Sequence, residues 1–111
     1  MASREDGMLL VQVAQWGSTM GLEEAQLAVW ADDFNPEEAS PDDVFVTRIL
    51  NWGETIGTLT KNGLLDTDLV LDWLWVAGLW SRVGPAARKL REKHGEAALY
   101  ENFEALAGRQ G

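Results

Sequence analysis

The stretch that decides the fold is residues 41–62, PDDVFVTRILNWGETIGTLTKN. Its apolar side chains recur at alternating intervals of four and three residues, the spacing of a helix packed in a bundle. They are Phe45, Ile49, Trp52, Ile56 and Leu59. A polar stripe with the same spacing lies opposite and includes Glu54, which we expect to be solvated. The stretch therefore predicts an amphipathic helix with one buried face.

This helix carries its own start, stop and contact signals. Ser40 is the expected N-cap, followed by a proline at the first helical position, where the missing N–H costs nothing. Asn62-Gly63 predicts a left-handed C-terminal stop. Gly53 and Gly57 lie four residues apart beside the apolar stripe. We expect these two glycines to allow another backbone to approach closely; the alternative is that they are merely tolerated, at about 1 kcal/mol each.

The segment from residue 67 to about 83 is apolar nearly all round. Such a helix is either central in its own domain or shared with a partner chain. Asp66 is its expected N-cap, and Gly84-Pro85 is expected to kink or end it. Residues 85–94 predict a basic helix closed by Gly95.

Helical signals also cover both ends of the chain. Residues 4–33 predict one kinked helix or two short ones, with Leu22, Ala25, Val29 and Trp30 in one apolar stripe, and residues 34–43 form a loop. Residues 96–108 predict a last helix with Leu99, Phe103 and Leu106 toward the core, and residues 108–111 a frayed tail. The prediction is an all-α single domain over residues 1–111, a compact bundle of four to five helices.

Charge and composition argue against nucleic-acid and membrane partners. The formal net charge of −9 opposes the dense negative charge of nucleic acids, so we expect no nucleic-acid partner. No apolar stretch approaches the roughly 20 residues of a membrane span, and the chain has no cysteine. We therefore expect no membrane partner and a cytoplasmic location.

The residue types of common active sites and metal sites are scarce. His94, the single histidine, is expected to be exposed at a helix end, where it would compensate the dipole. The acidic loop of residues 32–38 does not match an EF-hand, because counting from Asp33 the sixth position is Glu38 instead of glycine and the twelfth is Val44 instead of glutamate. We therefore expect no metal ion and no cofactor.

Asp72 is the carboxylate that stands out, because it interrupts the most apolar helix. A buried carboxylate has to be paired or protonated, so Asp72 is either a pocket acid or part of an exposed strip, and we favour the strip. An enzyme using Asp72 and Glu54 is the least favoured hypothesis, because nothing in the sequence orients a substrate.

Six tryptophans are unusual in 111 residues. Tryptophan fills cores, anchors interfaces or stacks on flat ligands. Trp73 and Trp75 are two residues apart and so point about 200° apart on a helix. One of them can face the core and the other a partner, although both could be core. The candidate interface or ligand residues are Trp52, Trp73, Trp75, Trp80, Asp72 and Arg82.

Charge is distributed unevenly along the chain. Residues 82–93 hold five of the nine bases, whereas residues 1–43 hold ten acids and one base. The two segments could pair across a dimer or within one bundle. The basic run could also meet a phosphate or an acidic partner, or it could be a solvated face.

Three phrases together resemble a family of small bacterial helical proteins described as a domain of unknown function. They are KNGLLDTDLVLDWLWVAGLW (61–80), LYENFEALA (99–107) and NWGETIGTLT (51–60). The resemblance covers roughly the last 65 residues well and the first 40 loosely. It implies an α-helical fold and a bacterial cytosolic setting, and no catalytic residues.

These observations leave two main hypotheses for the function. The first is a non-enzymatic interaction or scaffolding module that forms a homodimer through its tryptophan-rich helix. The alternative is a small-molecule-binding protein with a tryptophan-lined pocket between helices, in which Trp52, Trp75 or Trp80 faces a flat ligand.

Overall fold

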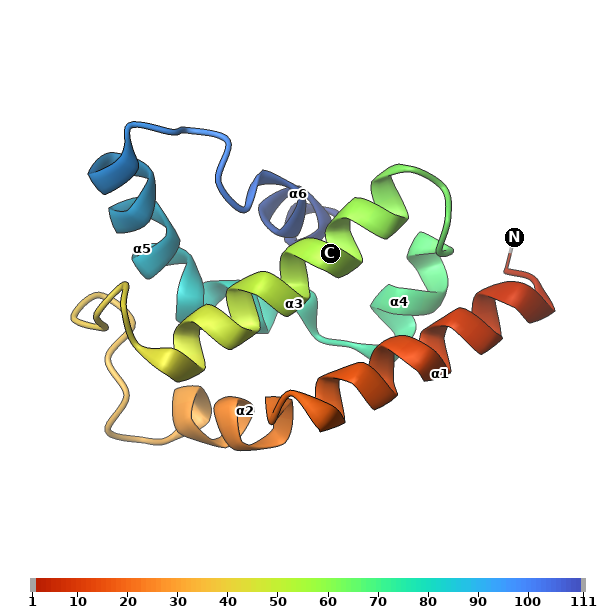
Figure 1. Ribbon diagram of the computed structural model, residues 1–111, viewed down its shortest axis with the longest axis horizontal. Coiled ribbons are helices and arrows are strands. Elements are labelled where there is room, and N and C mark those ends of the chain that lie inside the picture. Colours follow the sequence, from red (N-terminus) through yellow and green to blue (C-terminus); the bar gives the residue numbers. More distant parts are fainter. Residues whose placement is uncertain (1, 111) are drawn as a thin grey trace.

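The structure is a computed structural model that describes residues 2–110. Within that range the chain forms six helices and no strand. They are α1 (Arg4–Thr19), α2 (Leu22–Trp30), α3 (Val44–Lys61), α4 (Thr67–Trp73), α5 (Val76–His94) and α6 (Glu101–Arg109). The all-α prediction is confirmed, with one helix more than the upper expected number (Figure 1).

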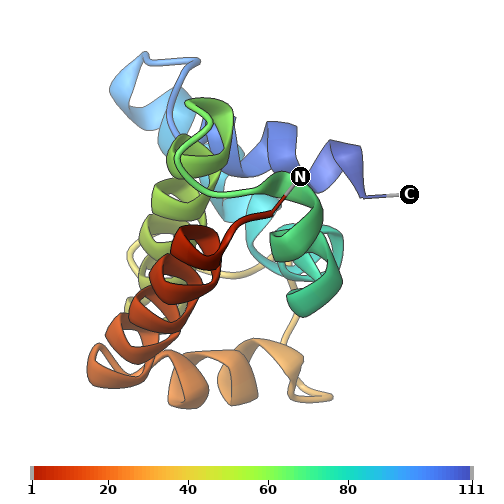
Figure 2. The same cartoon turned by 90° about the vertical axis from the view of Figure 1, so that its right-hand side faces the viewer.

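Helix α3 is the central element and packs against α2, α5 and α6. In Figure 1 it crosses the middle of the molecule, with α1 and α2 following one another below it. Its predicted apolar stripe faces the core, since Ile49, Trp52 and Ile56 are at most 1% exposed. Turned by 90°, Figure 2 shows α4 beside the N-terminal half of α1. Between residues 2 and 110 no helix combines the length and hydropathy needed to cross a membrane.

The start of α3 differs from the prediction. Its N-cap is Asp43, whose Oδ1 accepts hydrogen bonds from the amides of Phe45 (2.8 Å) and Val46 (3.1 Å). Ser40 instead accepts from the amide of Asp42 (3.1 Å), within the preceding turn. Asp43 prevails because its carboxylate satisfies two of the orphan donors at once. The predicted stop is confirmed, with Gly63 in the left-handed region at φ 71°.

The predicted continuous helix from residue 67 to 83 is wrong, because the chain breaks at Leu74 and Trp75. Leu74 is extended (φ −125°, ψ 133°). Trp75 (φ −82°, ψ 79°) is the central residue of an inverse γ-turn closed by a 3.0 Å bond from the Val76 amide to the Leu74 carbonyl. Asp66 is the N-cap of α4, as predicted.

Helix α5 does not end at Gly84-Pro85 but continues through Pro85 to His94. Gly95 then adopts the predicted left-handed conformation at φ 63°. Both Gly84 and Pro85 are buried, so packing around this turn holds the helix together across the missing proline N–H. His94 is exposed at the end of the helix.

The helices at the two ends of the chain have more definite bounds than the sequence predicted. The N-terminal segment is two helices, separated at Gly21 (φ 81°). The last helix starts at Glu101 and not at residue 96, because Tyr100 adopts a left-handed conformation (φ 60°) that interrupts the helix. Helix α6 extends through residues 108 and 109, and Gln110 is held by side-chain hydrogen bonds, so these residues differ from the expected frayed tail. Gly111 lies outside the described residues.

Candidate functional site

Of the four candidate tryptophans, one lies in the core and one packs against it. Trp52 is 1% exposed, and its Nε1 donates to the carbonyl of Val13 at 3.3 Å. Trp80 is half-buried, and its ring meets Phe103 edge-to-face with 5.1 Å between ring centroids. The guanidinium of Arg91 lies 5.8 Å from the Trp80 ring. The Trp52 ring is therefore closed to a ligand, and the Trp80 ring is partly covered by these contacts.

Trp75 is the most exposed tryptophan, with 64% of its surface accessible. Its ring stacks on Trp30 of α2 at a centroid distance of 5.3 Å and an interplanar angle of 9°. The same ring covers Gly78, where an added Cβ would come within 2.3 Å of it. Trp75 is therefore held in place on two sides while a large part of its surface remains in contact with solvent.

Trp30 was expected in the apolar stripe of its helix, yet it is 39% exposed. Val29 is the residue of α2 that enters the core at this end, being fully buried. Leu27, about one helical turn before Trp30, is 70% exposed. The sequence did carry a signal for this second apolar face. Leu27 and Trp30 are three residues apart, and neither is among the residues of α2 that the core buries.

Arg82 is committed to the protein backbone. Its Nε donates to the carbonyl of Val29 at 2.7 Å, and one terminal nitrogen lies 3.3 Å from the carbonyl of Ala31 and 3.5 Å from that of Phe34. The guanidinium also lies over the rings of Trp30 (5.4 Å) and Phe34 (5.3 Å). Arg82 thus caps the carbonyl end of α2, where the helix dipole favours a cation, and supports the Trp30 ring.

The tryptophan patch comprises Leu27, Trp30 and Trp75, supported by Arg82. The structure thus brings two of the predicted site residues, Trp75 and Arg82, to one place, and adds two that sequence reasoning missed. Trp73 lies elsewhere, edge-to-face with Trp52 at 5.7 Å and 38% exposed.

The two carboxylates considered for catalysis have other environments. Asp72 is exposed, as favoured, and borders an open hollow beside two further aspartates, Asp66 and Asp68. Glu54 is not merely solvated, because it is half-buried and its Oε1 accepts from the amides of Asn102 and Phe103, both at 3.0 Å. Glu54 therefore caps the start of α6.

No metal-ligand set was found among residues 2–110, where no three histidine, aspartate or glutamate side chains lie close enough together to hold an ion. His94 is on the exposed end of α5.

The basic segment of α5 contacts the loop of residues 34–43 in the same chain. Lys89 Nζ donates to the carbonyls of Glu37 (2.6 Å) and Ala39 (3.2 Å). Lys93 Nζ lies 3.7 Å from the carboxylate of Asp42. Of the alternatives for this charge pattern, pairing within one bundle is the one that these contacts support.

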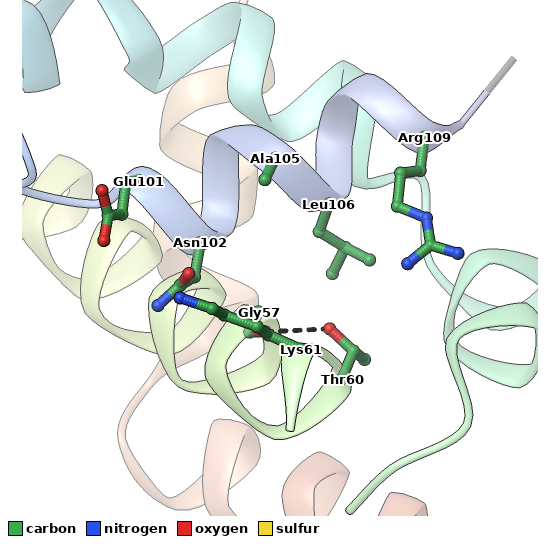
Figure 3. A pocket seen from close by; sticks show the side chains of 8 residues that line it. All are labelled: Gly57, Thr60, Lys61, Glu101, Asn102, Ala105, Leu106 and Arg109. Atoms are coloured by element: carbon green, nitrogen blue, oxygen red, sulfur yellow. Dashed lines mark hydrogen bonds between the residues drawn. The ribbon is translucent and has the colours of Figure 1, made fainter. Parts of the chain in front are cut away.

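A second candidate site is a groove of about 410 Å³ between the last turns of α3 and one face of α6 (Figure 3). Its lining residues are Gly57, Thr60, Lys61, Glu101, Asn102, Ala105, Leu106 and Arg109. In Figure 3, Leu106 and Arg109 face the Thr60 turn across open space. Lys61 and Arg109 make no salt bridge to any residue within 2–110. The groove contains no tryptophan.

One apolar region of the core, within the described residues, is by contrast tightly packed. The region bordered by Trp52, Leu74, Val76 and Phe103 has no volume that a water molecule could occupy. This region around Trp52 therefore offers no pocket for a flat ligand.

Comparison with curated proteins gave no significant match, and neither did comparison with solved structures. A family model does match, and it includes the second part of α1 as well as the regions that carry the three quoted phrases. Because this model, described as a domain of unknown function (DUF4760), matches residues 14–110, the chain belongs to that family.

Proposed function

We propose that this domain is a non-enzymatic protein-interaction module that forms a homodimer through the tryptophan patch. The observation that carries the proposal is the Trp30–Trp75 stack, with Trp75 held in place and yet 64% exposed. Tryptophan is enriched among the residues that dominate binding energy at interfaces. The cysteine-free composition suits a cytoplasmic location.

Preorganisation favours the patch as a binding surface. Ordering a flexible side chain at an interface costs about 0.5–1.5 kcal/mol. The rings of Trp30 and Trp75 are already fixed against each other, and Gly78 and Arg82 support them from the protein side. Little further ordering is needed when a partner covers them.

A second copy of the chain is the partner we infer, because the patch is compatible with two-fold pairing. In a two-fold dimer the same patch meets itself. Its members Leu27, Trp30 and Trp75 are uncharged, and its one supporting cation, Arg82, is already bound to backbone carbonyls. Two patches can therefore face each other without opposing like charges at the centre.

Light scattering over a hundredfold range of concentration tests the proposal. The wild-type mass should approach twice 12.3 kDa, and Trp75→Glu should return it to that of one chain. Leu64→Glu is the matched control, because Leu64 is 63% exposed and lies in the turn between α3 and α4, away from the patch. A wild type that is monomeric throughout, or a Trp75→Glu variant that stays dimeric, would contradict this dimer surface.

A small organic anion bound in the α3–α6 groove is a second candidate function. Lys61 and Arg109 outweigh the single carboxylate of Glu101 among the lining residues, and Leu106 and Ala105 supply apolar surface. The volume lies within the roughly 300–1,000 Å³ of ligand pockets.

Calorimetric titration with citrate would test this second candidate. Saturable binding that is lost in Lys61→Gln/Arg109→Gln and kept in Arg88→Gln would support it, because Arg88 is exposed on α5 and does not line the groove. Absence of binding, or equal binding by all three proteins, would count against the groove.

A further inference from the structure

The side chain of Gln110 lies against the break between α4 and α5. Its Nε2 donates to the carbonyls of Leu71 (3.0 Å) and Leu74 (2.9 Å). Its Oε1 accepts from the amide of Ala77 at 2.8 Å. One primary amide thus bonds to the end of one helix and the beginning of the next.

These are backbone groups that a continuous helix would satisfy by itself. In an α-helix each amide donates to the carbonyl four residues earlier. An uninterrupted helix would bond the Trp75 amide to the Leu71 carbonyl, the Gly78 amide to the Leu74 carbonyl, and the Ala77 amide to the Trp73 carbonyl. At the break, the Gln110 side chain stands in for the missing helix partners. It is the donor to the carbonyls of Leu71 and Leu74 and the acceptor for the amide of Ala77.

The break is what places Trp75 on Trp30. On a continuous helix Trp75 would lie about 200° from Trp73, with its direction fixed by the helix. In the inverse γ-turn the Trp75 ring instead covers Gly78 and stacks on Trp30. The backbone groups at the break are half-buried, and a polar group withdrawn from water without a partner is unfavourable, so the break depends on partners for the Leu71 carbonyl and the Ala77 amide.

We infer that Gln110 is the positioning residue of the tryptophan patch: by bonding to Leu71, Leu74 and Ala77 it keeps α4 and α5 apart and holds Trp75 against Trp30. The inference about geometry stands on these hydrogen bonds alone. Its consequence for dimerisation rests on the proposed function.

The test compares Gln110→Met and Gln110→Glu with wild type in the full chain. Met keeps the approximate size of the side chain and forms none of the three bonds. Glu can still accept from Ala77 but cannot donate to the two carbonyls. The control is Gly108→Ala, two residues earlier in α6, where an added Cβ would meet nothing within 4 Å.

Hydrogen exchange of the Ala77 amide and the exciton band of the stacked tryptophans in circular dichroism report on the junction. We expect exchange at Ala77 to accelerate about tenfold in Gln110→Met, as the loss of one hydrogen bond implies, and much less in Gln110→Glu. The exciton band should weaken in both variants and persist in Gly108→Ala. Unchanged exchange and an unchanged band in Gln110→Met would overturn the positioning role.

Light scattering on the same samples separates this inference from the proposed function. If the junction changes and the mass falls to that of one chain, both stand. If the junction changes and the dimer persists, the role of Gln110 stands and the dimer surface is wrong. A thermal transition that remains cooperative shows that each variant is folded when measured.

Discussion

Replacing Gly57 with alanine should separate α3 from α6. A Cβ built at Gly57 would lie 2.5 Å from the carbonyl carbon and oxygen of Asn102 and 2.8 Å from the amide nitrogen of Phe103. These are backbone atoms, which cannot rotate away as a side chain could. Ordinary van der Waals contact begins at 3.4 Å, so the helices have to part by on the order of 1 Å.

The cost can be worked from this geometry. Overpacking a well-packed site costs about 1–3 kcal/mol. The same movement lengthens the two hydrogen bonds that amides of α6 donate to the Glu54 carboxylate, each contributing about 1 kcal/mol. Alanine in turn recovers about 1 kcal/mol of helix propensity. The net expectation for Gly57→Ala is a loss of about 2 kcal/mol of unfolding free energy, or about 10 °C in the melting temperature.

Gly108→Ala is the matched control, because Gly108 is helical and a Cβ added there would meet nothing within 4 Å. That variant should be more stable than wild type by about 0.5 kcal/mol. Urea denaturation followed by circular dichroism measures both variants. If Gly57→Ala proves as stable as Gly108→Ala, with an unchanged denaturant slope, the close approach of α3 and α6 is refuted.

Three further predictions concern charge. Glu54→Ala leaves two amides of the first turn of α6 without their acceptor and should lower the unfolding free energy, measured by urea denaturation, by about 2 kcal/mol. Glu101 is an exposed residue of α6, so Glu101→Ala should change the unfolding free energy by less than about 0.5 kcal/mol. Two copies each carrying −9 repel one another, so raising the salt concentration should tighten the dimer in light scattering; weakening would indicate an interface dominated by attractive ion pairs. Hydrogen bonds from Ser3 lower the pKa of Asp6, which also accepts from the amide of Asp66. Because folding lowers the pKa of Asp6, the bond from the Asp66 amide is present at higher pH and is lost as the pH falls through the lowered pKa. The chemical shift of the Asp66 amide should follow this acidic transition, and a shift independent of pH would contradict the contact.

Sequence periodicity determined which segments are helical and, for α3, which face is buried. The four-three spacing around Trp52 specified the buried face of α3, and Gly53 and Gly57 indicated a close contact. Local capping chemistry at Asp66 and Gly95 was also readable, because the partners of a cap lie within a few residues along the chain.

The candidate site depended on contacts between distant segments. Nothing near residues 74 and 75 specifies a helix break, since the polar groups that make it tolerable belong to Gln110, more than thirty residues away. The environment of Trp75 likewise depends on Trp30, and Arg82 supports that pairing from a third segment. Local sequence determined which segments become helices because helix hydrogen bonds span four residues. Tertiary structure decided where they break and which tryptophans face solvent, because those outcomes depend on polar and aromatic groups that only the folded chain brings together.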